Sequence, residues 1–174
     1  MATGLVRRPP MRAHLAYLSY VLRHKWYVLL ACRQTGCSLW RGLIHDLSKF
    51  LPSEWGPYAR TFYALVGSKK QYSESDEFRV AWLHHQHRNT HHWNYWVQID
   101  APMGAGRAVR MPDRYVREMV ADWIGAGLAQ GKPDVLGWYL ANEHKMLLHS
   151  DTRASVERLL GISDETAAAR EREP

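Results

Sequence analysis

The chain is poor in cysteine, with only Cys32 and Cys37 among its 174 residues. These two residues lack the CxxC spacing and have no second pair to join them, which argues against a cysteine-based zinc site. Two cysteines are also too few for a disulfide framework of the kind that small secreted domains use. The sequence therefore predicts reduced thiols and a cytoplasmic location.

Long apolar runs and phosphate-binding glycine motifs are also missing. No apolar run approaches the ~18 residues that a membrane-spanning helix needs. The opening residues, MATGLVRRPPMR, lack the apolar stretch of a secretory signal. We therefore predict no membrane partner. The sequence also has no P-loop and no dinucleotide-binding glycine motif, so no such motif identifies a substrate.

The composition is that of one globular domain, with 46% apolar and 23% charged residues. Eight Trp and nine Tyr are many for this length, and such rings fill a core or line a cleft. Part of the net charge of +6 lies in Arg7, Arg8 and Arg12, and the other basic residues are dispersed. This charge is compatible with nucleic acid and equally with a basic cleft for a phosphorylated small molecule. We favour a solubilising surface with a frayed basic arm over a nucleic-acid surface.

Turn and cap residues divide the chain into about six or seven helices, with no segment of strand periodicity. We predict an all-α fold with a single helical domain at 12–162, a flexible basic arm at 1–11 and a polar tail at 163–174. Polar loops are expected at 67–74 and around Pro102 and Gly104. The expected helices cover 12–33 and about 38–50, start again at Pro52, run from Ser75 to the low nineties, and restart at Pro112, Pro133 and Asp151.

The most informative feature is the doublet His45-Asp46 within the run GLIHDLSK. Two neighbouring metal-ligand types lie in an apolar helical stretch, where burying either one without a partner would be unfavourable. A divalent metal ion would relieve this cost, since imidazole and carboxylate groups both bind such ions. Lys49 follows one turn later, and it can either pair with Asp46 or reach a phosphate held on the metal.

A second group of candidate ligands is the histidine cluster at 84–92, with five histidines in nine residues. If the helix continues, His85, Asn89 and His92 lie on one stripe, with His91 on a neighbouring line. Five histidines cannot all be ligands. We favour His85 and His92, with His91 as a close competitor. The alternative is a polar helix face that happens to be rich in histidine.

Two further residues are weak candidates when taken alone. A single helical histidine such as His24 is more often a surface or core residue than a ligand. Asp122 lies among apolar neighbours and needs a partner if it is buried, but a cap or a salt bridge would serve. The order His, His-Asp, His, His, Asp along a helical chain is much more specific than any one member.

Several segments resemble known proteins. GLIHDLSKF resembles the metal-binding helix of the HD-domain superfamily of metal-dependent phosphohydrolases, and VADWIGA resembles its later Ala-Asp helix. HHQHRNTHHW resembles the middle histidines of its two-metal members. RHKWYV, WRGLIHDLSKFLPSEWGPYAR, AWLHHQHRNTHHWNYW and EMVADWIGAG more closely resemble an uncharacterised bacterial and phage family within or near that superfamily. The resemblance covers residues 12–153 and implies an HD-like helical bundle.

The resemblance also implies a set of ligands for one or two divalent ions, with Mn, Fe, Co, Zn and Mg all compatible. One ion would be held by His24, His45, Asp46 and Asp122. A second would be held by His85 and His92 (or His91), with Asp46 bridging the two ions. In typical two-metal members the middle histidines come from separate elements, whereas here they are only six or seven residues apart.

These features predict a metal-dependent phosphohydrolase that acts on a nucleotide or a related phosphate ester through a metal-activated water. Lys49, Arg23 and Arg88 are the candidates for neutralising charge on the phosphate oxygens. Asn89 is a candidate for orienting the nucleophile.

Glu54 and Glu118 are further acid–base candidates, although both fit a helix surface better. Two other functions are weighed against the hydrolase. The same ligand set in this superfamily can bind two irons and activate oxygen, so a di-iron oxygenase is the second enzyme hypothesis. The basic excess alone would suit a non-catalytic nucleic-acid-binding protein. The oligomeric state is not predicted.

Overall fold

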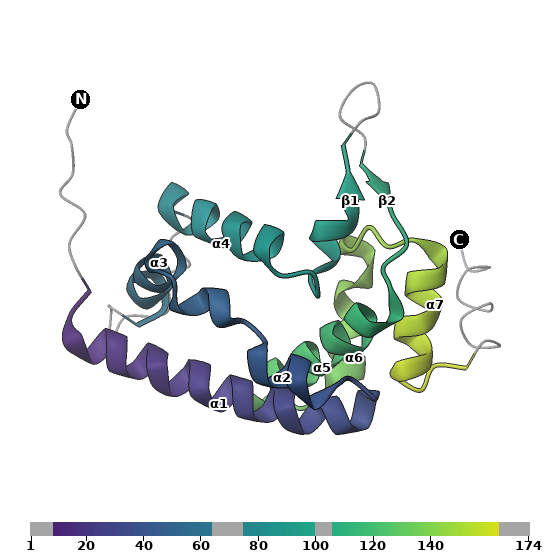
Figure 1. Cartoon of the computed structure of the whole chain (residues 1–174), viewed down its shortest axis with the longest axis horizontal. Helices are drawn as coiled ribbons and strands as arrows, with labels where there is room; N and C mark the ends of the chain where they lie inside the picture. Colours follow the sequence, from purple (N-terminus) through teal and green to yellow (C-terminus); the bar gives the residue numbers. More distant parts are fainter. Residues whose placement is uncertain (1–8, 64–74, 100–105, 164–174) are drawn as a thin grey trace.

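The computed structural model describes residues 9–63, 75–99 and 106–163. These residues form seven α-helices, short 3-10 turns and one small hairpin (Figure 1), which confirms the expected all-α class. The hairpin was not predicted. Its strands β1 (Val97–Gln98) and β2 (Arg107–Ala108) pair antiparallel. Strands of two residues are too short to produce an alternating pattern that a sequence could reveal.

The longest helix among the described residues is α1 (Met11–Thr35). Its buried residues recur in steps of three and four, which places them on one face of the helix. The helix ends at Gly36, whose φ of 69° is the left-handed conformation that glycine adopts readily. The buried face of α1 packs against α3 (Pro52–Tyr63) and α5 (Asp113–Ala129).

The helix predicted at about 38–50 is interrupted at the doublet. The structure has α2 (Leu39–Ile44), followed by His45 and Asp46 in non-helical conformations and the 3-10 turn η1 (Leu47–Phe50). Asp46 is the one described non-glycine residue with a positive φ, at 55°. Asp tolerates this region better than most residues because its short side chain is polar. The interruption could not be read from the apolar pattern, which runs through it.

The prediction that the fourth helix reaches the low nineties is also wrong. Helix α4 (Asp76–Arg88) begins at Ser75, whose hydroxyl accepts a hydrogen bond from the Phe78 amide at 3.3 Å. It ends at Asn89, whose φ and ψ are extended. His91 and His92 therefore lie in a turn before η2 (Trp93–Trp96), and the predicted helical stripe ends at Asn89.

The C-terminal helices begin where the sequence predicted. Helix α5 follows Pro112, α6 (Val135–Asn142) follows Asp134, and α7 (Ser150–Leu159) follows after the turn η4 (Glu143–Lys145). They enclose an apolar cluster around Met119, Val120 and Tyr139. Within the described part of the chain, no helix is both long and apolar enough to cross a bilayer. The predicted arm and tail, and the loops at 67–74 and around Pro102 and Gly104, lie almost wholly outside the described residues.

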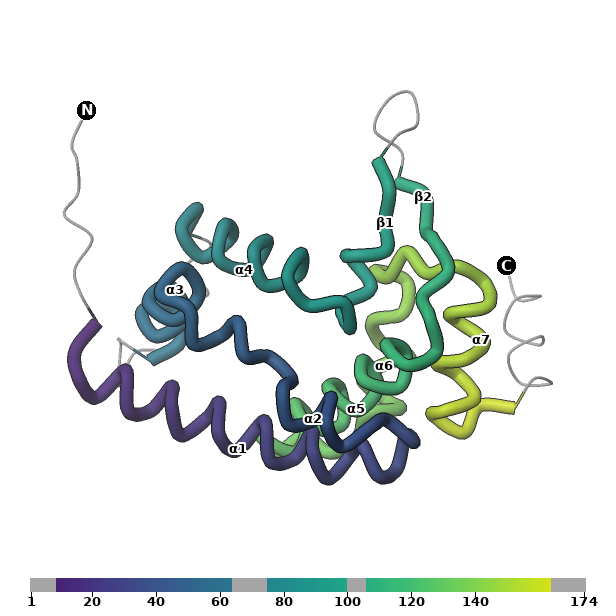
Figure 2. The backbone as a smooth tube through the Cα atoms, viewed as in Figure 1, coloured from purple at the N-terminus to yellow at the C-terminus, as the bar shows by residue number. Residues whose placement is uncertain are grey.

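The path of the chain brings the site together (Figure 2). The α2–η1 segment runs beside α1, and the turn after α4 returns toward the middle of the molecule. Helices α1 and α5 approach closely at Gly125, where an added Cβ would lie 2.7 Å from the backbone nitrogen of Val28. One turn earlier on each helix, His24 and Asp122 face each other.

Candidate metal centre

Residues from five separate segments meet in one buried group. All the predicted ligands except His92 are at least nine-tenths buried, and the surrounding chain largely covers His92 as well. Helix α1, the last turn of α4 and helix α5 each supply one candidate ligand. The turn after α2 and the turn after α4 each supply two. The residues are His24, His45, Asp46, His85, His91, His92 and Asp122.

The first set of ligand atoms surrounds one oxygen of Asp46. The Nε2 atoms of His24 and His45 lie 3.5 and 3.3 Å from Asp46 Oδ2. The same two nitrogens lie 3.1 and 3.3 Å from Asp122 Oδ1. The four residues each offer a ligand atom within 4.8 Å of the others, which is a spacing that one metal ion can span.

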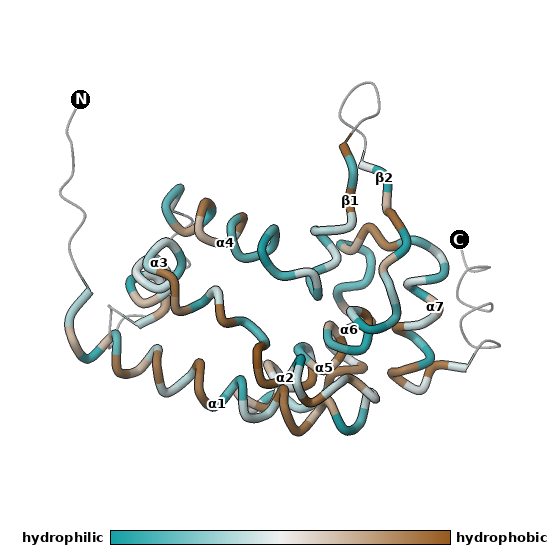
Figure 3. Tube along the Cα trace, viewed as in Figure 1, coloured by the Kyte–Doolittle hydropathy of each residue, from teal (hydrophilic) through white to brown (hydrophobic). Residues whose placement is uncertain are grey.

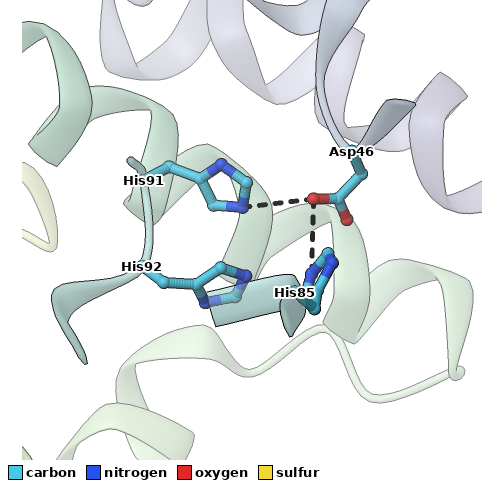
Figure 4. Close-up of side chains that lie close together, drawn as sticks. All are labelled: Asp46, His85, His91 and His92. Atoms are coloured by element: carbon cyan, nitrogen blue, oxygen red, sulfur yellow. Dashed lines mark ion pairs between the residues drawn. The ribbon is translucent and has the colours of Figure 1, made fainter. Parts of the chain in front are cut away.

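The second set surrounds the other oxygen of the same carboxylate (Figure 4). The Nε2 atoms of His85 and His91 lie 3.4 and 3.3 Å from Asp46 Oδ1. His92 belongs to this set as well, since its ligand atom lies within 4.8 Å of those of the other three residues. Asp46 is therefore common to both sets, with one oxygen toward each. The geometry brings His91 and His92 together instead of choosing between them.

The left-handed conformation of Asp46 is what makes this sharing geometrically feasible. In a continuous helix, His45 and Asp46 would point about 100° apart around the axis and could not both face one point. The break after α2 turns both side chains inward, where they are 1% and 2% exposed. Such a backbone conformation is unfavourable for a non-glycine residue, and it clusters at functional sites.

Two buried carboxylates form a further layer around the histidines. Glu118 Oε1 lies 3.2 Å from His45 Nδ1 and 3.4 Å from His91 Nδ1. Its other oxygen accepts hydrogen bonds from Arg41, with Nε at 2.7 Å and Nη2 at 2.6 Å. Because a carboxylate only accepts, Nδ1 of each histidine is the donor, and Nε2 is the nitrogen left to bind a metal ion.

Glu54 makes the corresponding contact with His85, the candidate ligand from α4. Its Oε2 lies 2.9 Å from His85 Nδ1 and accepts a hydrogen bond from the Ser48 hydroxyl at 3.0 Å. Arg88 donates to Oε1 at 2.8 Å. The expectation that Glu54 and Glu118 lie on helix surfaces is wrong, because they are 0% and 4% exposed. For Glu118 the signal was present, since it precedes Asp122 by four residues and therefore shares its helix face.

The inner nitrogen atoms have no other function in the fold. Nε2 of His24, His45, His91 and His92 is buried and makes no hydrogen bond to any part of the chain that the structure describes. Leaving buried polar atoms without partners is unfavourable. Nitrogen and carboxylate donors aimed at common points suit divalent transition metals, so the residues present fit such an ion.

The charges of the site residues oppose the effect of burial. Burial alone would raise the pKa of Asp46, but the charges of His45 and Lys49 hold that pKa well below its usual value. Burial alone would lower the pKa of His45, but the neighbouring carboxylates of Asp46, Asp122 and Glu118 raise it well above its usual value. Burial and the neighbouring charge of His91 lower the pKa of His92, which is therefore a neutral imidazole.

A cavity of about 740 Å³ adjoins the centre. His24, His85, His92 and Asp122 line it on the side of the ligand groups. Its other walls combine aromatic rings with cationic side chains, listed here as Tyr20, Phe78, Trp82, Arg23, Lys49 and Lys132. The cavity therefore joins the ligand groups to a basic, aromatic enclosure within the size range of small-molecule sites.

The four residues predicted to act on substrate fall into two groups. Arg23 and Lys49 line the cavity, and Lys49 Nζ lies 2.5 Å from Asp46 Oδ2. Arg88 instead donates to Glu54 and Ser53, and Asn89 donates to Ser48 and to the backbone oxygen of His85. The side chains of Arg88 and Asn89 therefore hold Glu54, Ser48 and the backbone around His85 in place.

Fold and site together define an all-α protein with a buried His/Asp group that could bind a metal ion. The chain belongs to a family of unknown function (DUF5662), whose model matches residues 13–162. This match includes every residue of the candidate centre. No curated protein and no solved structure matches the chain.

Proposed function

We propose that this protein is a metal-dependent phosphohydrolase that acts on a nucleotide or a related phosphate ester. The observation that carries the proposal is the shared carboxylate of Asp46, with one ligand group on each oxygen, beside a cavity lined by Arg23 and Lys49. The resemblance of GLIHDLSKF and VADWIGA to HD-domain segments supports the same reaction class. The position of the break at Asp46 further supports a functional use of this residue.

One or two divalent ions bound by these residues would supply Lewis acidity and lower the pKa of water from 15.7 toward ~7. The residues of the site hold and orient the centre. His24, His45 and Asp122 hold one side of the centre. Glu118 keeps the rings of His45 and His91 in the tautomer that presents Nε2 inward.

The cavity walls suit a phosphate ester. Lys49 is a cation in the folded protein, because Asp46 and Asp122 raise its pKa although burial alone would lower it. Together with Arg23 it can neutralise charge that develops on phosphate oxygens. Lys49 pairs with Asp46, and it would exchange this partner for substrate oxygens. The rings of Tyr20, Phe78 and Trp82 provide flat surfaces for the organic part of the ester.

The test combines elemental analysis with a phosphate-release screen over nucleotides and simple phosphate esters, in the presence of Mn, Co, Fe or Mg. We expect metal in the purified protein and turnover with at least one ester. His45→Ala and Asp46→Ala should lose the metal and lower kcat/KM at least about 100-fold while the far-ultraviolet dichroism is retained. His144→Ala, at an exposed position on η4, is the matched control and should leave both unchanged.

Two outcomes would contradict the proposal. A magnetically coupled iron pair without phosphate release from any ester would instead indicate the di-iron oxygenase. Salt-dependent binding to nucleic acid that His45→Ala leaves unaffected, in a protein without metal, would indicate the non-catalytic alternative.

A further inference from the structure

Helix α1 carries a second apolar stripe, which faces solvent. Leu15, Leu22 and Trp26 are 60%, 55% and 58% exposed. They follow one another in steps of seven and four, so they lie on one side of the helix, distinct from the buried face that includes His24. Scattered exposed leucines are ordinary on protein surfaces, but a continuous stripe that ends in a tryptophan is not.

The α2–η1 segment widens this stripe into a face. Lys25 on α1 donates hydrogen bonds to the backbone oxygens of Leu43 and His45, which fixes the segment beside the helix. Figure 3 shows apolar residues along both α1 and the neighbouring segment. Six large apolar side chains between Trp40 and Leu51 extend the stripe, and they are between 39% and 66% exposed. We call the combined surface the α1–η1 face, with the members Leu15, Leu22, Trp26, Trp40, Leu43, Ile44, Leu47, Phe50 and Leu51.

The N-terminal part of the chain, which includes α1 and α2, carries charge of one sign. Residues 1–45 contain seven Lys and Arg and no Asp or Glu, whereas residues 46–174 contain sixteen basic and seventeen acidic residues. The whole net positive charge therefore belongs to residues 1–45, which include α1 and α2. The one acidic residue within α1, α2, η1 and their connections is Asp46, which is buried in the candidate metal centre. Arg12, Arg23 and Arg33 are exposed on α1.

We propose that the α1–η1 face binds the surface of an anionic lipid bilayer. Exposed Leu, Phe and Trp side chains with basic neighbours are the features by which amphipathic surfaces enter the boundary between headgroups and acyl chains. Anionic headgroups attract the basic residues that border such a surface. This attachment is peripheral and needs no spanning helix. The sequence predicted no membrane partner because it has no long apolar run, and this face is assembled from two separate segments.

The composition of the α1–η1 face argues against a second copy of the chain and against nucleic acid as its partner. A symmetric dimer through this face would bring the same basic residues of two copies together, and like charges across an interface are unfavourable. Nucleic acid would satisfy the basic residues, but its phosphate-rich surface would leave nine large apolar side chains without a favourable contact. An anionic bilayer is complementary both to the apolar side chains of the face and to its basic residues.

The experiment is sedimentation of the purified full chain with two kinds of vesicle, phosphatidylcholine alone and phosphatidylcholine mixed in equal parts with phosphatidylglycerol. We expect binding to the mixed vesicles, little binding to the neutral ones, and a decrease at high salt. Leu22→Glu and Trp26→Glu should each lower the partition coefficient at least about tenfold. Trp138→Glu on α6, where the tryptophan is 45% exposed, is the matched control and should bind as the original chain does.

Asp46→Ala separates this surface from the metal centre, which could itself bind a lipid phosphate. The variant should keep full vesicle binding while it loses metal. The membrane-binding proposal can therefore hold even if the phosphohydrolase proposal fails. Absence of vesicle binding would overturn the inference, as would binding that Leu22→Glu and Trp26→Glu both leave unchanged. A dimer in light scattering that Trp26→Glu dissociates, together with unchanged vesicle binding, would assign the face to a second copy instead.

Discussion

Three histidines of the candidate centre are held from behind by carboxylates. His45 and His91 share Glu118, and His85 contacts Glu54. Arg41 and Arg88 in turn hold these two carboxylates by hydrogen bonds. Such outer partners orient the ring and raise the basicity of the nitrogen that binds a metal. The arrangement is asymmetric, because Glu118 serves both ligand groups and Glu54 serves one.

This asymmetry predicts different effects of two equivalent substitutions. Glu54→Gln should weaken the binding of one ion, whereas Glu118→Gln should weaken both, each by about 10–100-fold. Glutamine keeps the size of the side chain but removes the charge that stabilises Nδ1–H. The measurement is competition between the protein and a chromophoric chelator, with the stoichiometry followed by Co²⁺ absorption.

Glu157→Gln is the matched control for these two variants. Glu157 is also a buried carboxylate, 9% exposed, but it accepts its hydrogen bond from the Tyr139 hydroxyl away from the centre. Its substitution should leave both metal affinities unchanged. If Glu54→Gln and Glu118→Gln weakened the same number of ions to the same extent, the proposed division of the ligands would be wrong.

Protons must leave when a metal binds. The pKa values of His45 and His91 are raised because their carboxylate neighbours outweigh the opposing effect of burial. Both imidazoles are therefore protonated in the metal-free protein at pH values where a free histidine is neutral. A metal ion requires the neutral form. Metal affinity should therefore increase with pH, and it should decrease as the pH falls toward the usual histidine value and below.

Calorimetry in two buffers with different heats of ionisation measures this release. We expect at least about one proton released to the buffer per ion bound near neutral pH. His92→Ala should leave the proton count nearly unchanged, because a lowered pKa keeps that ring neutral. A metal affinity independent of pH would contradict the assignment.

Among the elements, the pair of α1 and α5 sets the geometry of the centre. Gly125 on α5 lies against Val28 on α1, where an added Cβ would come within 2.5 Å of Val28 Cγ2. Gly125→Ala should therefore separate the helices and destabilise the fold by about 1–3 kcal/mol. Asp122 would move away from His24, so metal affinity should also decrease. Urea unfolding and chelator competition measure the two effects.

Gly56→Ala on α3 is the matched control. An added Cβ there lies 3.5 Å from the flexible end of Arg60, which is ordinary contact. Alanine is favoured over glycine within a helix by about 0.5–1 kcal/mol, but its Cβ directly before Pro57 disfavours the helical conformation. The two effects oppose each other, so this variant should change the stability little. A Gly125→Ala variant as stable as Gly56→Ala would show that the close approach of α1 and α5 has no energetic importance.

At the scale of the whole molecule, the centre joins α4 and the turns beside it to the closely packed pair of α1 and α5. Among the described residues, the apolar core is divided into three clusters, around Tyr139, around Tyr17 and around Val28. The candidate ligands come from α1, α4, α5 and two turns, so a bound ion would connect all of them. A ligand that binds only the folded state stabilises it by mass action.

Removal of metal should therefore lower the melting temperature of the whole molecule. With free metal about 100-fold above its Kd, the stabilisation of about 2.7 kcal/mol corresponds to roughly 5–10 °C at this chain length. Scanning calorimetry before and after chelation, and again after metal is restored, measures the difference. Asp46→Ala should show no response to chelator, and a response in that variant equal to the original would contradict the assigned ligands.

Much of the fold and of the candidate site was predictable from local chemistry. The all-α class, the helix starts at Pro52, Pro112 and Asp134, and the candidate ligand residues follow from periodicity, cap residues and the resemblance. The helix ends near the site were not predictable. The breaks at Asp46 and Asn89 oppose the local helical pattern, and they persist because the packed surroundings hold His45 and His91 inward.

The sequence by itself determined which residue types were present and in what order, because helical periods and caps depend on near neighbours. The tertiary structure alone decided what those residues contact. It placed Glu54 and Glu118 behind the histidines, divided the oxygens of Asp46 between two groups, and joined α1 to the α2–η1 segment in one apolar face. These contacts span tens of residues along the chain, and no local pattern specifies them. The His45-Asp46 doublet was evident from the sequence, and its environment followed only from the fold.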